Sequence, residues 1–244
     1  MRAVAVIPAR YGSTRLPGKP LVKLLGKELL LHVIDRARGS SLLSDIIVAT
    51  DDQRIRDLAL SYGVKAVMTP PDCPSGTDRV ALAVRDIECD IVVNLQVDDP
   101  TINPEAIDLA IRALEEDPLA KVSTLCKRIE KGEEIYSPHV VKVVFDKNYN
   151  ALYFSRSPIP YERNKGALYY KHIGPYVFRR DFIFTFTSWE PTFLERVESL
   201  EQLRILENGY RIKLVEVFYE SVEVDVPEDI PLAEEILRRY QSQI

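Results

Sequence analysis

Runs of apolar residues alternate with segments of helical periodicity along the first half of the chain. Apolar runs predict strands at residues 3–7, 46–50, 64–68 and 91–95. Apolar positions at helical spacing predict helices at residues 28–38, 52–62, 78–86 and 103–116. Strands without polar alternation are typical of a parallel sheet that is covered on both faces. This half is therefore predicted to be a doubly wound α/β unit.

The pattern changes after residue 121, where strands follow one another with only short helices between them. The predicted strands are residues 122–126, 140–145, 151–155 and 172–178. Residues 158–171 carry two prolines and no clear period, so they are predicted to form a loop. A strand ending at Val224 and a helix over 228–239 complete the chain. The pattern favours a mixed sheet inserted into the α/β unit, followed by a return to the core.

Length and composition are those of one folding unit. The chain has 244 residues, 46% of them hydrophobic and 28% charged, which is enough to bury a sizeable core. No repeat, low-complexity tract or linker marks a boundary. We expect a single domain that consists of residues 1–120, an inserted region 121–210 and a C-terminal return 211–244.

Charge and cysteine spacing narrow the classes of function. A net charge of -5 argues against sequence-independent binding of nucleic acid, which needs a basic surface. The start, MRAVAVIPAR, lacks a secretory leader, and no run of eighteen apolar residues is present, so we expect a cytoplasmic protein with no membrane partner. Cys73, Cys89 and Cys126 lack C-x-x-C spacing, which argues against a disulfide framework and a structural zinc site.

The first candidate site is the loop PARYGSTRLPGKP at residues 8–20. The loop leaves the carboxyl end of the first predicted strand, where parallel sheets usually bind ligands. It carries Arg10, Arg15 and Lys19 together with two glycines. Glycines let backbone N–H groups approach phosphate oxygens, and the cations can offset the charge of a triphosphate. The loop has neither GxGxxG nor Walker A spacing. It predicts a phosphate site, with an exposed basic loop as the alternative.

The second candidate site consists of aspartates at predicted strand ends. The run IVVNLQVDDP ends in Gln96, Asp98 and Asp99, and Asp225 follows another β-branched run in VEVDVPED. Mg²⁺ prefers oxygen ligands and often takes only one or two of them from protein. Each aspartate alone is equally typical of a helix cap or a turn. Their occurrence at strand ends beside a cationic loop favours a magnesium site.

The third candidate site is PSGTDR at residues 74–79. Small polar residues at this point can cap a helix, and the same groups can contact a nucleobase edge or a ribose. A simple helix start is the alternative.

These segments together resemble the 3-deoxy-manno-octulosonate cytidylyltransferases, the CMP-Kdo synthetase family. The resemblance rests on PARYGSTRLPGKPL, PSGTDR, NLQVDDP, VKVVFD with ALYFSRSPIP, KHIGPY, VESLEQLRILENG and VDVPEDI, in that order from residue 1 to about 235. It implies a Rossmann-like nucleotidyltransferase fold, with a mostly parallel central sheet flanked by helices. It also implies the transfer of CMP from CTP to Kdo, an eight-carbon sugar acid, with Mg²⁺ as cofactor, for lipopolysaccharide biosynthesis. Residues 121–210 would bind the sugar and form a homodimer contact.

The resemblance implies roles for individual residues. The catalytic residues would be Lys19, Arg10, Asp98 and Asp225, and the two aspartates would hold Mg²⁺. The nucleotide-binding residues would be Pro8, Ala9, Arg10, Gly12, Ser13, Arg15, Lys19, Ser75, Gly76, Thr77 and Arg79. The sugar-binding residues would be Gln96, Arg156, His172, Tyr176, Glu201 and Gln202.

The chain departs from the usual family pattern at a few positions. Val97, Asp99 and Val226 replace residues of the usual QGDEP and VDTPED, and Pro175 and Val177 stand where isoleucine and glycine are more usual. Val97 adds bulk and Val226 lacks a hydroxyl, so these changes bear on the choice of sugar while both candidate metal ligands are kept.

Several alternatives remain open at this point. Within the enzyme class, the substrate could be 8-amino-3,8-dideoxy-Kdo or another 2-keto sugar acid. In a different class, the chain could be a nucleotide-sensing binding protein without turnover. Among the sugar-site residues, His172 could be a structural strand residue, and Glu201, Gln202 and Arg204 could form a solvated helix face.

Overall fold

The chain forms two compact units in the computed structural model, which describes residues 1–13 and 15–241. The first unit comprises Met1–Asp108 and Tyr219–Ile244, and the second unit comprises Leu109–Phe218. Helix α4 (Pro104–Glu116) begins in the first unit and ends in the second. Among the helices of the described residues, none is long and apolar enough to cross a membrane.

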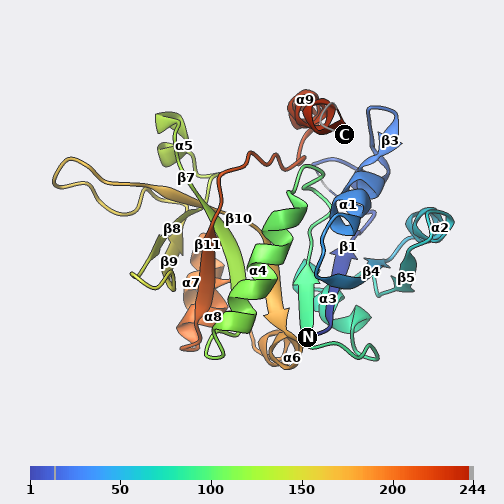
Figure 1. The fold of residues 1–244 in the computed structure, drawn as a ribbon, viewed down its shortest axis with the longest axis horizontal. Coiled ribbons are helices and arrows are strands. Elements are labelled where there is room, and N and C mark those ends of the chain that lie inside the picture. Colours follow the sequence, from blue (N-terminus) through green and yellow to red (C-terminus); the bar gives the residue numbers. More distant parts are fainter. Residues whose placement is uncertain (14, 242–244) are drawn as a thin grey trace. The chain divides into compact units, whose positions relative to one another are not determined.

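A parallel sheet forms the centre of the first unit (Figure 1). Its strands lie in the order β6 (Ile91–Asn94), β1 (Ala3–Pro8), β4 (Leu43–Thr50) and β5 (Lys65–Met68). Every residue of β1 and of β6 is buried, as expected of apolar strands covered by helices. The helices of this unit are α1 (Leu29–Arg38), α2 (Gln53–Ser61), α3 (Gly76–Ala83) and α9 (Ile230–Gln241). The α/β class predicted from the sequence is confirmed.

Local side chains explain where two helices of this unit begin. The carboxylate of Asp52 accepts a hydrogen bond from the backbone N–H of Arg54 and caps α2. The hydroxyl of Ser75 accepts one from Asp78 and caps α3. Such caps satisfy N–H groups that have no partner within the helix. Helix α3 therefore begins two residues before the predicted start, and it ends three residues before the predicted end.

The first unit also contains short elements after the glycine-containing loop. A 3₁₀ turn (Lys19–Leu21) precedes a small antiparallel hairpin of β2 (Lys23–Leu24) and β3 (Lys27–Glu28). A second 3₁₀ turn (Pro227–Asp229) leads into α9.

The second unit contains the expected mixed sheet. Its strands lie in the order β11 (Ile212–Glu216), β7 (Val122–Arg128), β10 (Tyr170–Arg179), β8 (Lys142–Phe145) and β9 (Ala151–Ser155). Strand β7 is antiparallel to β10 and parallel to β11. The helices of this unit are α5 (Gly132–Tyr136), α6 (Arg180–Thr187), α7 (Phe193–Glu198) and α8 (Leu203–Glu207).

Several elements differ from the expectation, and among the strands neither β11 nor the β2–β3 hairpin was predicted. The prediction of a strand that ends at Val224 is wrong, because the segment before Val224 does not pair with another strand. The N–H groups of Val222 and Val224 instead donate to the Thr101 hydroxyl and to the Asp98 carbonyl. Helix α6 was not predicted, since its phenylalanine, isoleucine and threonine residues favour strands. Its side chains at Phe182 and Phe186 are nevertheless buried at helical spacing, so packing overrides local preference.

Candidate active site

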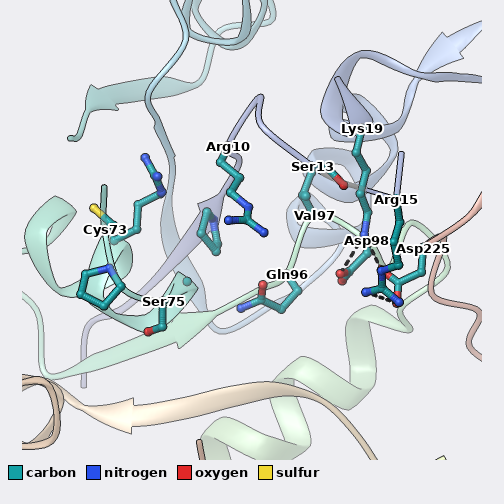
Figure 2. Close-up of a pocket in the computed structure, with 14 residues that line it drawn as sticks. Arg10, Ser13, Arg15, Lys19, Cys73, Ser75, Gln96, Val97, Asp98 and Asp225 are labelled. Atoms are coloured by element: carbon teal, nitrogen blue, oxygen red, sulfur yellow. Dashed lines mark hydrogen bonds and ion pairs between the residues drawn. The ribbon is translucent and has the colours of Figure 1, made fainter. Parts of the chain in front are cut away.

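A cavity of about 310 Å³ lies at the carboxyl ends of β1 and β6 in the first unit. Figure 2 shows Arg15 and Lys19 beside Asp98 and Asp225 at one end, Ser75 at the start of α3 at the other end, and Arg10 between them. The cavity is lined by Pro8, Arg10, Ser13, Arg15, Lys19, Cys73, Pro74, Ser75, Gly76, Arg79, Gln96, Val97, Asp98 and Asp225. Three sequence segments predicted separately therefore meet at one site.

The described parts of the loop, residues 8–13 and 15–20, are held by backbone hydrogen bonds and by the half-buried carboxylate of Asp51. The carbonyl of Tyr11 accepts hydrogen bonds from the N–H groups of Ser13 at 2.9 Å and of Gly18 at 3.1 Å. Gly18 has a φ of 66°, in the left-handed region that glycine adopts readily. The carboxylate of Asp51 accepts from the N–H of Tyr11 at 3.0 Å. These contacts hold Tyr11, Ser13 and Gly18 in the two described parts of the loop, which carry Arg10 in one part and Arg15 and Lys19 in the other.

Lys19 joins the two predicted metal ligands. Its Nζ lies 3.1 Å from a carboxylate oxygen of Asp98 and 2.9 Å from one of Asp225. Arg15 adds a second ion pair to Asp225 at 3.0 Å. Burial lowers the pKa of Lys19, but the carboxylates of Asp98 and Asp225 outweigh this effect and raise it above 10.5. The ammonium is therefore fully charged at neutral pH.

The geometry of the aspartates tests whether this chain could hold a divalent cation. Asp98 and Asp225 already direct carboxylate oxygens at one positive charge, and their side chains are 25% and 31% exposed. Two convergent, accessible carboxylates fit Mg²⁺, which commonly takes one or two protein ligands and completes its shell with water and substrate phosphates. Among the described residues, no cluster of three or more potential ligands occurs.

Hydrogen bonds join the segment that contains Asp98 and Asp99 to the segment that precedes Asp225. The carbonyl of Asp98 accepts a hydrogen bond from the N–H of Val224 at 2.7 Å. Asp99 does not line the cavity in this structure: its carboxylate is buried and accepts from the hydroxyls of Ser221 and Thr101. Burial raises the pKa of Asp99 to about 6, although these hydrogen bonds oppose the change. Asp99 therefore anchors the segment that carries Asp225.

The start of α3 forms the other end of the cavity. Gly76 packs closely against Gln96, since a Cβ at Gly76 would lie 3.3 Å from the Gln96 Nε2 atom. The amide of Gln96 in turn donates to Asn94 at 2.7 Å. Arg79 is 3% exposed and its guanidinium contacts Thr69 at 2.5 Å and Asp51 at 3.6 Å. These contacts leave α3 with a fixed N-terminal edge that faces the loop cations across the cavity (Figure 2).

Three of the predicted nucleotide-site residues do not line the cavity. Ala9 is buried and its N–H donates to Ala49. Thr77 is also buried, and its hydroxyl accepts a hydrogen bond from Asn94 at 3.1 Å. Gly12 is exposed, with open space among the described residues where a Cβ would lie. Cys73 lines the cavity and was not singled out from the sequence, although it directly precedes PSGTDR.

The remaining predicted sugar-site residues belong to the second unit. The ring of His172 stacks on Tyr176 with centroids 5.0 Å apart and meets the edge of Phe154 at 5.5 Å. Burial lowers the pKa of His172 to about 4, so its ring is neutral at pH 7. Arg156 donates from Nε to the Glu198 carbonyl at 2.8 Å and from Nη1 to the Pro138 carbonyl at 2.9 Å.

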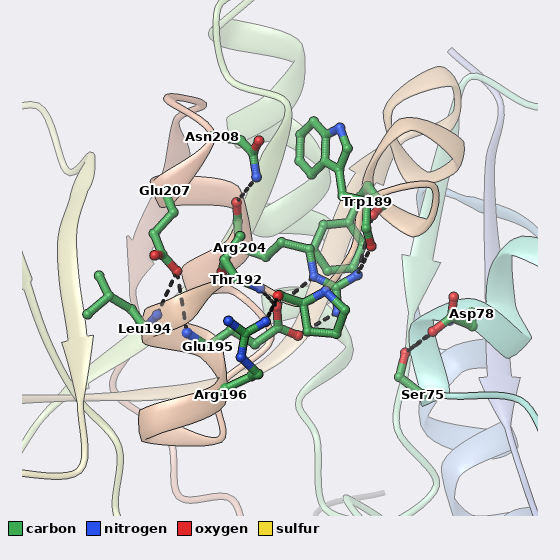
Figure 3. A network of polar contacts seen from close by, with 12 residues as sticks. Ser75, Asp78, Trp189, Thr192, Leu194, Glu195, Arg196, Arg204, Glu207 and Asn208 are labelled. Carbon is green, nitrogen blue, oxygen red and sulfur yellow. Dashed lines mark hydrogen bonds and ion pairs between the residues drawn. The ribbon is translucent and has the colours of Figure 1, made fainter.

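The helix-face alternative for Glu201, Gln202 and Arg204 is wrong for two of these residues. Gln202 is 4% exposed and Arg204 is 6% exposed. Figure 3 shows the Arg204 guanidinium paired with the Glu195 carboxylate and donating to the Trp189 carbonyl at 3.0 Å. The amide of Gln202 and the charge of Arg204 therefore lie in the protein interior, whereas Glu201 is partly exposed.

Comparisons with known proteins identify a family. The sequence model described as "Cytidylyltransferase" matches residues 4–214. A protein of Pelobacter propionicus called 3-deoxy-manno-octulosonate cytidylyltransferase is 47% identical over 255 residues, covering 100% of both chains. A protein of the same name from Syntrophus aciditrophicus is 50% identical and covers 97% of each chain. The resemblance inferred from the sequence motifs is confirmed.

Solved structures agree with the sequence comparison. A structure of CMP:2-keto-3-deoxy-manno-octonic acid synthetase complexed with CTP matches 98% of this chain and 100% of its own, with a TM-score of 0.94 and 41% identity. A 4-diphosphocytidyl-2C-methyl-D-erythritol synthase from Anaerococcus prevotii matches with a TM-score of 0.65 at 15% identity, which shows a shared fold alone. The predicted nucleotidyltransferase fold is confirmed.

Proposed function

Because the chain belongs to the cytidylyltransferase family, we propose that it transfers CMP from CTP to the anomeric hydroxyl of 3-deoxy-D-manno-octulosonate, giving CMP-Kdo and pyrophosphate. The observation that carries the proposal is the convergence of Asp98, Asp225 and Lys19 in one cavity with Arg10 and the start of α3. The proposal is supported by two relatives with this name and by the CTP-bound structure of a similar synthetase.

The first unit would bind CTP. Arg10, Arg15 and Lys19 carry positive charge into the cavity, and Ser13 contributes a hydroxyl from the same loop. These groups suit the three phosphates, because preorganised donors stabilise charge that develops on the leaving pyrophosphate. Ser75 and Gly76 at the opposite end suit the cytosine and ribose. Discrimination against UTP would come from a buried acceptor that the cytosine amine satisfies and the uracil carbonyl does not.

Asp98 and Asp225 would hold Mg²⁺. A bound Mg²⁺ supplies neutralisation of the triphosphate charge and activates the α-phosphate towards attack. Lys19 lies between the same two carboxylates, so its ammonium would contribute next to the metal, at the phosphates. Asp99 would act indirectly, by holding the segment with Asp225 beside Asp98.

Residues of the second unit would bind the sugar acid, and the role of Gln96 in sugar binding rests on the family resemblance alone. Arg156 suits the carboxylate, since a guanidinium can form two parallel hydrogen bonds with it. His172, Tyr176, Glu201 and Gln202 would contact the hydroxyl groups. The anomeric hydroxyl at C2 would attack the α-phosphorus in line, the bond to the pyrophosphate would break, and no covalent enzyme intermediate would form. Catalysis then reduces to positioning and electrostatic stabilisation.

The wider setting of the reaction follows from its chemistry. Residues 1–120, 121–210 and 211–244 would act as a single nucleotidyltransferase domain, which is supported by a family match that continues through both units. The enzyme would work in the cytoplasm, where CTP is available, and its product would feed lipopolysaccharide biosynthesis. A homodimer formed through residues 121–210 is proposed on the family resemblance.

Pyrophosphate release is the experiment that tests the proposal. The purified chain is incubated with Mg²⁺, each of the four nucleoside triphosphates, and either Kdo, 8-amino-3,8-dideoxy-Kdo or a sialic acid. We expect release with CTP and Kdo, and much slower release with UTP. Release with the amino sugar alone would change the substrate and keep the reaction. CTP binding without turnover for any sugar would favour a nucleotide-sensing protein and overturn the proposal.

A further inference from the structure

A buried threonine next to the sugar-site histidine has no role in the proposal above. Thr124 lies on β7 and is 0% exposed, and His172 lies on β10, opposite Cys126 of β7. Side chains two residues apart in a strand point to the same face, so Thr124 and His172 are diagonal neighbours on one face of the sheet. The Thr124 hydroxyl oxygen lies 2.9 Å from Nε2 of His172.

The same hydroxyl oxygen also contacts two carbonyl groups. It lies 3.1 Å from the Ile173 carbonyl oxygen and 2.9 Å from the Pro175 carbonyl oxygen. A hydroxyl has one hydrogen to donate, and a carbonyl oxygen can only accept. The Thr124 hydrogen must therefore point at these carbonyls, and only a lone pair of the hydroxyl remains for His172.

This arrangement determines which nitrogen of His172 carries hydrogen. Two lone pairs facing each other at 2.9 Å would repel, so Nε2 must donate. In a neutral imidazole only one nitrogen carries hydrogen, so Nδ1 is then a bare acceptor. Among the described residues, no hydrogen bond is found at Nδ1, and His172 is partly exposed. The stacked ring of Tyr176 and the edge of Phe154 limit its rotation.

We propose that Thr124 is a positioning residue, which holds His172 in the Nε2–H form so that Nδ1 accepts a hydrogen bond from a hydroxyl group of the sugar acid. The inference rests on the proposed function for the identity of the ligand. Nδ1 of His172 can then only accept a hydrogen bond. The site therefore selects a sugar acid with a hydroxyl donor facing Nδ1, and it rejects an analogue in which the group facing Nδ1 can only accept.

Nuclear magnetic resonance tests the proton position directly. The chain has three histidines, His32, His139 and His172, so long-range ¹H–¹⁵N spectra of the labelled protein are simple, and a His172→Gln variant assigns the signals. We expect a protonated Nε2 and a bare Nδ1 in the wild-type chain and in Thr124→Ser. We expect a mixture of both forms in Thr124→Val. A bare Nε2 in the wild-type chain would overturn the inference.

Kinetics test the consequence for the substrate. Thr124→Val should raise the KM for the sugar about tenfold, as the loss of one well-placed hydrogen bond predicts, with little change in CTP affinity or in thermal unfolding. Thr124→Ser should restore the wild-type KM. In a His172→Gln background, Thr124→Val should cause no further increase. Equal KM values for the valine and serine variants, or a full additional loss in the His172→Gln background, would overturn the role of the hydroxyl.

Failure of the proposed function would look different. If the wild-type chain shows the Nε2–H form and no transfer of CMP to any sugar acid, the substrate assignment of Nδ1 falls with the proposed function. The spectra of the wild type, Thr124→Ser and Thr124→Val would then still decide whether Thr124 controls the proton position of His172.

Discussion

The ammonium of Lys19 lies 2.9 Å from a carboxylate oxygen of Asp225, although 206 positions separate the two residues in the chain. The same ammonium lies 3.1 Å from Asp98, and the guanidinium of Arg15 pairs with the other carboxylate oxygen of Asp225. The cluster thus joins the loop after β1, the end of β6 and the segment before α9. These ion pairs place the two proposed metal ligands and two of the proposed phosphate-binding cations, Arg15 and Lys19, at one end of the cavity.

Loss of either aspartate should abolish most turnover. Asp98→Asn and Asp225→Asn each remove an anionic oxygen ligand while keeping the size of the side chain. We therefore expect the rate of pyrophosphate release to fall by a factor on the order of 100 or more, and the Mg²⁺ concentration needed for half-maximal rate to rise. A Mg²⁺ titration of pyrophosphate release measures both. Glu115→Gln is the control, because Glu115 is an exposed acid on α4. Near-normal rates of both variants at saturating Mg²⁺ would contradict the metal assignment.

Lys19→Met should make the fold more dependent on Mg²⁺. Without the ammonium, Asp98 loses its ion pair and Asp225 keeps only that with Arg15, so a divalent cation becomes the main way to neutralise both carboxylates. We expect Mg²⁺ to raise the melting temperature more in this variant than in the wild type. Catalytic efficiency should fall by an amount equivalent to about 2–4 kcal/mol.

Arg10→Ala provides the comparison for Lys19→Met. Arg10 lines the same cavity, while the ion pairs of the two aspartates are made by Lys19 and Arg15. We expect a similar loss of efficiency and an unchanged effect of Mg²⁺ on the melting temperature. If Mg²⁺ raises the melting temperature equally in both variants, the ammonium of Lys19 does not neutralise the carboxylates of Asp98 and Asp225.

Asp99→Asn should change how stability depends on pH. Burial raises the pKa of Asp99 from 3.8 to about 6, so between these values the folded chain keeps a proton that the unfolded chain has lost. The free energy of unfolding contributed by this group therefore falls as pH rises through that window, by about 3 kcal/mol in total. The charge of Asp98 also raises the pKa of Asp99, and the charge of Asp99 acts in turn on Glu223, Arg36, Tyr219 and Tyr240.

Urea unfolding between pH 4 and pH 7 checks the Asp99 prediction. Asparagine cannot ionise, so the variant should gain stability relative to the wild type as pH rises, while Glu115→Gln should follow the wild type. Parallel curves for Asp99→Asn and the wild type would show that Asp99 titrates as in the unfolded chain.

The sequence was sufficient for the parallel sheet and for the residues at its carboxyl edge. Apolar runs identify buried strands, and parallel strands bring their ends together, so Lys19, Ser75 and Asp98 could be expected at one site. Asp51 follows β4 at the same edge, yet its role was missed. Its partners are the N–H of Tyr11 and the guanidinium of Arg79, and no local spacing reveals either contact.

Burial of charged residues was the other feature that the sequence could not show. The charges of Glu201 and Arg204 are typical of a solvated helix face. In the structure, Glu195 and Arg204 belong to two different helices, α7 and α8, and pair in the interior (Figure 3). The packing of α7 against α8 decides their environment, and packing is set by the whole fold.

Disruption of this buried pair should strongly destabilise the second unit. Arg204→Met leaves the Glu195 carboxylate without its partner, and we expect a loss of about 3–5 kcal/mol in the free energy of unfolding. The double variant Glu195→Leu/Arg204→Met should lose less, because no unpaired charge remains. Urea unfolding measures both, with the exposed Arg196→Met as a near-neutral control. If the double variant is less stable than Arg204→Met, the unpaired Glu195 carboxylate is not the cause of the lost stability.

Arg156→Lys should impair use of the sugar acid far more than binding of CTP. The guanidinium of Arg156 is held by the carbonyls of Glu198 and Pro138, and its backbone N–H donates to the Glu198 carboxylate at 2.9 Å. All these partners belong to the second unit, whereas the proposed CTP cavity is lined by residues of the first. An ammonium cannot keep these carbonyl contacts and also offer a planar pair of donors to a carboxylate.

We expect the KM of the Arg156→Lys variant for the sugar to rise about tenfold or more, equivalent to about 1.4 kcal/mol or more. The dissociation constant of CTP, measured by calorimetry, should stay within about twofold of the wild-type value, and Arg163→Lys, at an exposed position of the loop before β10, should leave both quantities unchanged. Weaker CTP binding together with a normal KM for the sugar would show that Arg156 serves the nucleotide.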